Sequence, residues 1–78
     1  MSMTLSHLPA GCHGRVISVK TGEQLRNRLE DLGLMPGTLV TCRAAPQKGR
    51  PGIYVFRSTC LALRRQDGEC IDLKEVEP

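Results

Sequence analysis

The sequence predicts a mostly β fold, a small closed or half-closed β-barrel of about five short strands with one α-helix inserted after the first strand. Short β-branched runs recur between turns that contain Gly or Pro, which is typical of small barrels. The leucines at about residues 22–32 have helical spacing. The 78 residues leave room for one domain, so we assign residues 1–78 to a single unit.

The first nineteen residues predict a tail, a turn and a strand. Residues 1–4 show no clear pattern and are expected to be a loose tail. Leu5 and Leu8 indicate one apolar turn. The glycine-flanked segment 11–14 is expected to be an exposed turn, and the β-branched run 15–19 is the first expected strand.

The segment at about 22–32 carries the helix signals. Residues 21–24 fit a capping box, with Thr21 as the N-cap and Gln24 reaching back to it. Leucines then recur at i, i+4 and i+7, namely Leu25, Leu29 and Leu32. Gly33 suits a left-handed C-terminal cap, and Pro36 prevents continuation.

The second half of the chain predicts the remaining strands. Residues 39–43 are the second expected strand, and residues 46–52, with two Pro and two Gly, are expected to form an exposed hairpin tip. Residues 53–57 are the third strand. The run 61–63 is expected to be a single helical turn, and the alternating run 70–73 the last strand.

The apolar positions of these elements predict the core. Tyr54 and Phe56 share one strand face and are expected to fill the barrel rather than line a peptide groove, which turns Ile53 and Val55 outward. The expected buried set is Val16, Leu29, Leu32, Val40, Tyr54, Phe56, Leu63 and Ile71.

Composition limits the function classes. Eleven Lys and Arg against eight Asp and Glu give a net charge of +3, which suits solubility or an acidic partner. The first residues lack the pattern of a signal peptide, and the chain lacks an apolar run of about 20 residues, so we expect a cytoplasmic protein without membrane insertion. The absence of C-x-x-C spacing excludes a zinc ribbon, and three of the four cysteines are expected to be small buried hydrophobes.

Several segments resemble the FeoA family. Residues 28–37, RLEDLGLMPG, are similar to its R-L-x-x-L-G-L-x-P-G motif, and residues 61–64 match its L-A-L-R element. The resemblance implies an SH3-like barrel that assists a large membrane ferrous-iron permease, whose cytoplasmic part carries a GTPase domain. The chain departs from the family pattern in one extra residue in the hairpin, in Arg50 where Asp is usual and in Ser58 where Gly is usual.

The predicted partner surface combines apolar and basic residues. Its members are expected on the outward side of the third strand, at the hairpin tip or on the helix: Ile53, Val55, Arg57, Lys48, Arg50, Arg26 and Arg28. Apolar centres with charged surroundings are typical of transient interfaces. The alternatives are scattered apolar exposure and, for Arg28 and Arg64, a structural role in which the side-chain stems cover the barrel.

Metal binding is a second hypothesis. Cys12 and His13 are adjacent soft ligands in a glycine turn, and His7 is the other histidine. A site needs three or four ligands, so we expect any divalent Zn or Fe to be taken up opportunistically, between two molecules of a homodimer. No cofactor is expected to be required.

The sequence favours binding over catalysis. Two histidines without a nucleophile arrangement, and no Walker-type phosphate loop, give no basis for an enzyme. The first hypothesis, which the FeoA resemblance implies, is a module that binds the permease through its GTPase domain. The alternatives are an RNA-binding KOW-like barrel, which the shortage of aromatic residues for base stacking disfavours, and an iron-sensing domain like the C-terminal domain of iron-dependent repressors. No nucleic acid partner is expected.

Overall fold

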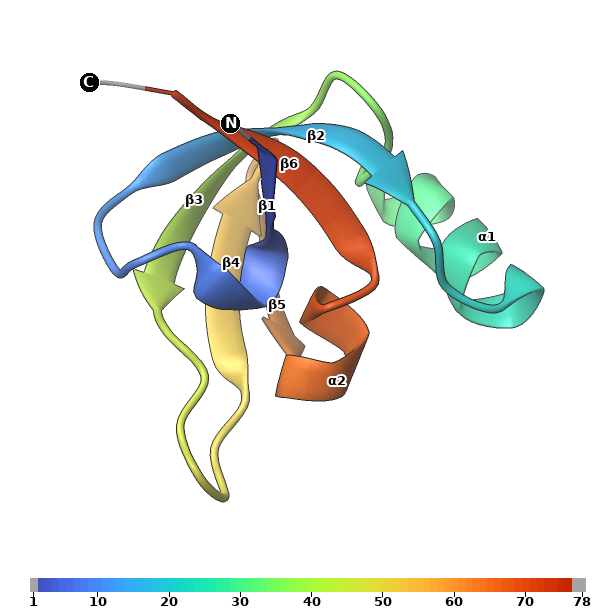
Figure 1. Ribbon diagram of the computed structural model, residues 1–78. Helices are drawn as coiled ribbons and strands as arrows, with labels where there is room; N and C mark the ends of the chain where they lie inside the picture. Colours follow the sequence, from blue (N-terminus) through green and yellow to red (C-terminus); the bar gives the residue numbers. More distant parts are fainter. Residues whose placement is uncertain (1, 77–78) are drawn as a thin grey trace.

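The computed structural model describes residues 2–76, which form one antiparallel sheet with two α-helices and a 3₁₀ turn (Figure 1). The strand order is β1-β6-β2-β3-β4-β5. The elements are β1 (Ser2–Thr4), η1 (Leu5–His7), β2 (His13–Val19), α1 (Glu23–Leu32), β3 (Leu39–Ala44), β4 (Gly52–Phe56), β5 (Thr59–Leu63), α2 (Arg65–Gly68) and β6 (Ile71–Val76). The mostly β fold and the helix after the first long strand are as predicted.

The expected loose tail at residues 1–4 is wrong, because Ser2–Thr4 form strand β1. This strand pairs antiparallel with β6, placing Met3 opposite Leu73. Met3 also packs against the core. This segment forms a strand because it pairs with β6, which lies far along the chain. A local sequence pattern cannot predict such a pairing. Met1 lies outside the described residues.

The helical turn expected at residues 61–63 is also wrong, because Thr59–Leu63 form strand β5. A two-residue turn reverses the chain after β4, and both of its residues have positive φ, 47° at Arg57 and 65° at Ser58. Such turns match the twist of paired strands, so they favour a hairpin. The helical turn follows one step later as α2.

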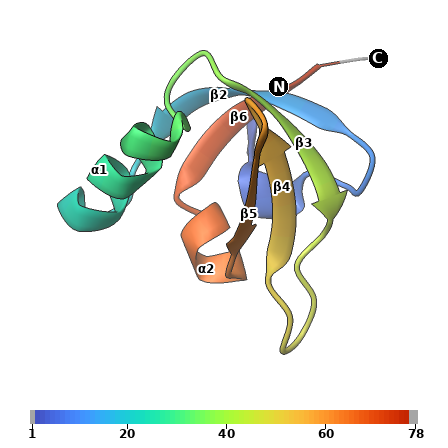
Figure 2. The same cartoon turned by 180° about the vertical axis from the view of Figure 1, so that it is seen from behind.

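The sheet curves around its core without closing into a full barrel (Figures 1 and 2). The register shifts between Val16 and Ser18 in the β2–β6 pairing and between Cys42 and Ala44 in the β3–β4 pairing. Irregularities of this kind bend a strand and increase its twist. Strands β1 and β5 are left as the two edges of the sheet.

Helix α1 has a glycine as the cap residue at each end. The N-cap is Gly22 and makes no side-chain cap hydrogen bond, so the capping box expected at Thr21 is wrong; the Thr21 hydroxyl instead donates to the Gly22 carbonyl (3.2 Å). Gly33 caps the C-terminus at φ 100° as predicted, and the Leu34 amide donates to the Leu29 carbonyl (2.8 Å).

The core lies on the concave side of the sheet. The predicted core residues are buried except Leu32, which is 37% exposed because α1 stands beside the sheet and buries Leu29 as its one fully covered residue (Figure 2). Four leucines outside the predicted core set are also buried, namely Leu5, Leu8, Leu34 and Leu73. Cys42 is buried, whereas Cys12 and Cys70 are half-buried and Cys60 is exposed, so the expectation of three buried cysteines is wrong.

Tyr54 is the largest core side chain and is 1% exposed. Its hydroxyl has no hydrogen-bond partner among the described residues. It lies against Gly52, where an added Cβ would stand 2.7 Å from the ring Cζ.

No helix in the described part of the chain is long and apolar enough to cross a bilayer.

Candidate functional site

A groove of about 370 Å³ separates α1 from β5, and we call it the helix groove. Its lining is mainly aliphatic: Leu25, Arg28, Leu29 and Leu32 from the helix, Leu61, Ala62 and Leu63 from the strand, and Pro51, Arg64 and Asp67 at one end. Leu29 is the one fully buried residue of α1, so Leu25 and Leu32 keep part of their surface open to this groove. A concave apolar surface with a few polar groups is the usual form of a binding site.

Strand β5 gives this groove a second property. It pairs with β4 on one side and is an edge of the sheet on the other. An edge strand carries backbone donors and acceptors that another extended segment can pair with. The helix groove thus offers apolar side chains next to an edge strand, the combination used for peptide addition to a sheet.

The charges of the helix groove are positive on balance. Arg28 and Arg64 line it together with one carboxylate, Asp67. Arg64 Nε lies 3.8 Å from Asp67 Oδ2, and the Arg64 side chain is 76% exposed, so this contact is weak. Arg28 and Arg64 are therefore placed to attract an acidic side chain on a partner.

The predicted apolar pair on β4 lies elsewhere. Ile53 and Val55 are both half-buried and line two different shallow hollows. Ile53 lies with Pro51 and Arg50, whereas Val55 lies with Thr41 across the β3–β4 pairing. The structure does not combine them with α1.

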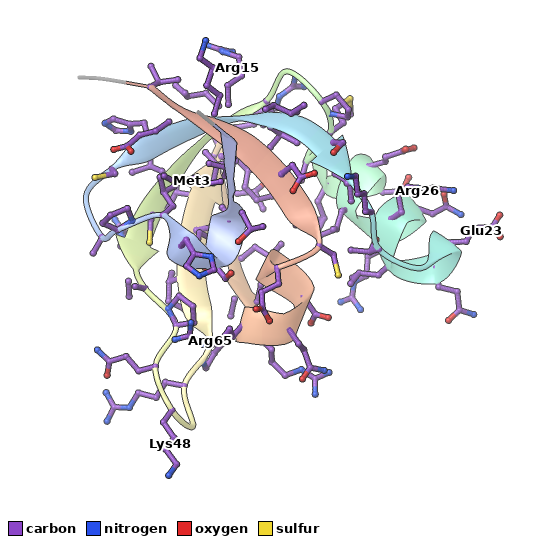
Figure 3. The ribbon with its side chains drawn as sticks, in the orientation of Figure 1. Met3, Arg15, Glu23, Arg26, Lys48 and Arg65 are labelled. Carbon is purple, nitrogen blue, oxygen red and sulfur yellow. The ribbon has the colours of Figure 1, made fainter. Side chains whose placement is uncertain are left out.

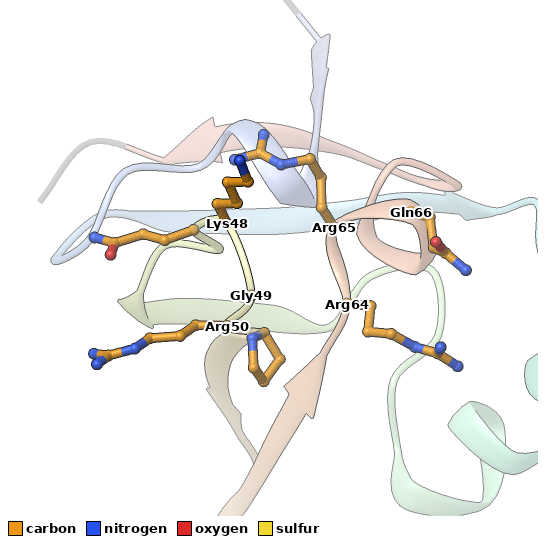
Figure 4. Close-up of a pocket in the computed structure, with 8 residues that line it drawn as sticks. Lys48, Gly49, Arg50, Arg64, Arg65 and Gln66 are labelled. Carbon is orange, nitrogen blue, oxygen red and sulfur yellow. The ribbon is translucent and has the colours of Figure 1, made fainter.

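The predicted basic residues fall into separate regions. Lys48 extends from the tip of the β3–β4 hairpin, while Arg26 lies on α1, away from that tip (Figure 3). Arg57 lies in the β4–β5 turn. Lys48 and Arg50 instead share a hollow with Arg64 and Arg65 at the start of α2 (Figure 4). This grouping cannot be predicted from a local pattern, because the two pairs are about fifteen residues apart in the sequence.

The predicted metal ligands do not converge within one chain. Cys12 packs against the core, whereas His13 Nδ1 lies 2.8 Å from the Thr41 hydroxyl. His7 Nδ1 lies 2.7 Å from the Thr4 hydroxyl. Within residues 2–76, no group of three or more His, Cys, Asp or Glu side chains is arranged to hold a metal ion. The described residues of one chain therefore do not form a complete metal site.

Comparisons with known proteins agree on one family. A family model described as the FeoA domain matches residues 3–75. The FeoA protein from Chlorobium tepidum, solved by NMR, is 36% identical, covers 96% of this chain and 71% of its own, and has a TM-score of 0.87. The zinc complex of Stenotrophomonas maltophilia FeoA is 29% identical, with coverages of 92% and 89% and a TM-score of 0.81.

That S. maltophilia protein is described as an SH3 domain protein, proposed to act as a ferrous-iron transport activating factor. A crystal structure of an iron uptake regulatory protein, also FeoA, superposes with a TM-score of 0.86 at 21% identity, over 97% of this chain and 100% of its own. A comparison with curated protein sequences found no significant match. The described residues therefore have an SH3-like fold, as the sequence resemblance implied.

Proposed function

The chain belongs to the FeoA family, and from this premise we propose that it is a non-enzymatic, cytoplasmic accessory protein of bacterial ferrous-iron uptake. Its partner is the membrane iron permease, which it binds through the cytosolic part that carries the GTPase domain. The description of S. maltophilia FeoA supports the transport role. The permease as partner is inferred from the family resemblance of the motifs at residues 28–37 and 61–64.

The helix groove is the observation that carries this proposal. It presents leucines on one wall and an edge strand on the other. We assign it to an extended apolar segment of the permease that adds to β5 and places an acidic side chain near Arg28. Backbone pairing then supplies affinity, and Leu32 and Leu61 supply selectivity for side-chain shape.

The test measures binding of the full-length protein to the purified cytosolic domain of the permease. Leu32→Asp puts a charge on the groove wall and is expected to weaken the complex at least about tenfold, or about 1.4 kcal/mol. Leu39→Asp is the matched control, because Leu39 is 43% exposed against 37% for Leu32 and lies on β3, outside the groove. Equal affinities of the two variants would show that the groove is not the contact surface.

The β4 face gives a second arm of the same experiment. The double variant Ile53→Asp, Val55→Asp tests the partner surface that is predicted from the sequence, because both side chains are still partly exposed to solvent. In cells that lack the native protein, Leu32→Asp should fail to restore ferrous-iron uptake and the β4 variant should restore it. The opposite pattern would place the contact on β4, with the basic hairpin tip.

Metal uptake between two molecules is a separate proposal, supported by the zinc complex of S. maltophilia FeoA. His7 is exposed and His13 half-buried, so both are reachable from a second copy. If the site lies between molecules, the chain should retain its circular dichroism spectrum in a chelator. Zinc should raise the molecular mass in solution by forming a dimer, and the chelator should reverse that rise. Unfolding by the chelator would instead indicate a structural site within the chain.

A further inference from the structure

Four cationic side chains surround one concavity next to the helix groove. We call it the basic hollow; it measures about 470 Å³, and its charged lining residues are Lys48, Arg50, Arg64 and Arg65. Gln47, Gly49, Pro51 and Gln66 complete the lining, and no carboxylate within residues 2–76 contributes to it. The hairpin supplies two of the charges and the start of α2 supplies the other two (Figure 4).

The walls of the basic hollow are held together by hydrogen bonds. Arg65 Nη2 donates to the Pro46 carbonyl (2.9 Å), which ties α2 to the base of the hairpin loop. The tip is closed by reciprocal bonds between Gln47 and Arg50, of 2.8 and 3.1 Å. Gly49 makes this tight turn possible at φ 77°. The two pairs of cations are thus brought together by the fold.

These cations are poorly neutralised. Residues 2–76 contain two ion pairs, Lys20–Asp72 and Arg64–Asp67, and the second is long at 3.8 Å. In Figure 4 the side chains of Arg50 and Arg64 extend to opposite sides. An anion in the hollow would balance part of this excess positive charge and accept hydrogen bonds from the cationic groups that line it.

The chemistry of the lining selects the kind of anion. Guanidinium groups present planar pairs of donors that match phosphate oxygens, and three of the four cations are arginines. No aromatic side chain lines the hollow, and Tyr54 and Phe56 are buried, so stacking of a nucleobase is not provided for. A single carboxylate would neutralise one charge of four, whereas a terminal phosphate carries about two.

We propose that the basic hollow binds a terminal phosphate group, either on a small soluble phosphate compound or on the headgroup of an acidic phospholipid. Lys48 and Arg50 close over the anion from the hairpin, Arg64 does so from α2, and Arg65 donates from the junction that its bond to Pro46 fixes. The hollow shares Pro51 and Arg64 with the helix groove, so an occupied hollow would alter the charge at one end of that groove.

The experiment is calorimetric titration of the full-length protein with inorganic pyrophosphate, with the ionic strength held at ~0.15 M by sodium chloride. We expect saturable binding that the double variant Lys48→Glu, Arg50→Glu weakens at least about tenfold, as loss of charge-assisted hydrogen bonds requires. The matched control is Arg43→Glu, Lys74→Glu, which changes the net charge equally at exposed positions outside the hollow. It should bind pyrophosphate within about twofold of the native protein.

A second arm distinguishes the two sources of phosphate. Co-sedimentation with phosphatidylcholine vesicles that contain phosphatidic acid, reversed by pyrophosphate, would identify a lipid headgroup. Pyrophosphate binding without sedimentation would identify a soluble phosphate. The proposal is overturned if neither probe binds, if the control variant weakens binding as much as the hollow variant, or if an oligouridylate binds more tightly than pyrophosphate.

Discussion

Replacing Tyr54 with Phe is expected to stabilise the domain. The Tyr54 hydroxyl is buried and has no partner within residues 2–76. A buried hydroxyl without a hydrogen bond costs about 1–3 kcal/mol, and the small void left by its removal returns part of that gain. We therefore expect the free energy of unfolding to rise by about 1 kcal/mol, which for a domain of this size raises Tm by about 4–8 °C.

A substitution at Gly52 tests the same contact with Tyr54 from the other side. A Cβ at this position would lie 2.7 and 2.8 Å from Cζ and Cε2 of the Tyr54 ring and would also overlap its hydroxyl. Gly52→Ala should thus destabilise the protein by about 1–3 kcal/mol. With Phe at position 54 part of the overlap disappears, so the double variant should be more stable than the sum of the single changes by about 0.5 kcal/mol or more.

Urea unfolding followed by circular dichroism gives the free energy of unfolding of the native protein, the two single variants and the double variant. Alkaline titration gives an independent check. Burial, and to a lesser degree Cys42, raises the pKa of Tyr54 to about 12 against the opposing effect of Arg65. The folded state then holds a proton that the unfolded state releases near pH 10, so stability falls between about pH 10 and 12. Phe at position 54 should flatten this fall. Destabilisation by Tyr54→Phe would refute the reasoning, because it would show that the hydroxyl has a partner such as a buried water.

Three further outcomes follow from local features. Ser58→Gly should raise the urea midpoint by the equivalent of about 0.5–1 kcal/mol, because Ser58 has φ 65° and glycine adopts this conformation without strain; an unchanged midpoint would mean that the turn relaxes. Hydrogen bonds from Lys20 and then Ser18 hold the pKa of Asp72 below its usual range. Stability from this contact is present above that range and lost on acidification. Lys20→Ala should therefore lower the urea midpoint at neutral pH, leave it similar in strong acid and so reduce the acid dependence of unfolding. Exposed Cys60 should react first with a thiol reagent, and Cys42 last, since burial raises its pKa; rapid labelling of all four cysteines would indicate an open core.

Local signals in the sequence were sufficient where the structure itself is determined locally. Gly33 ends α1 because a left-handed residue is needed there, and the alternation of Tyr54 and Phe56 places both inside. The same reasoning was wrong for Leu32. Helical periodicity identifies an apolar stripe, but how much of it is covered depends on how far the neighbouring sheet extends.

Non-local strand pairing explains why the sequence predictions for β1 and β5 were wrong. Strand β1 depends on β6, and β5 depends on a turn at Arg57 and Ser58 whose residues are not typical of positive φ. Leu61 and Leu63 are good helix formers, yet their pairing with β4 determines their conformation. The candidate sites share this property, because the helix groove and the basic hollow each join segments that are far apart in the sequence.

The attachment of α1 is asymmetric, and this has a consequence for its motion. Its C-terminal end is fixed by Leu29 and by the Thr38 hydroxyl, which donates to the Gly33 carbonyl (2.8 Å), whereas its N-terminal cap makes no side-chain bond. Amide hydrogens in the first turn should therefore exchange with solvent through local fraying, well before those of the sheet. A ligand seated in the helix groove would slow that exchange progressively from Leu29 toward Glu23. If the helix groove binds peptides as proposed, the range of peptide sequences that it binds would then depend on the free energy needed to order the N-terminal end of α1.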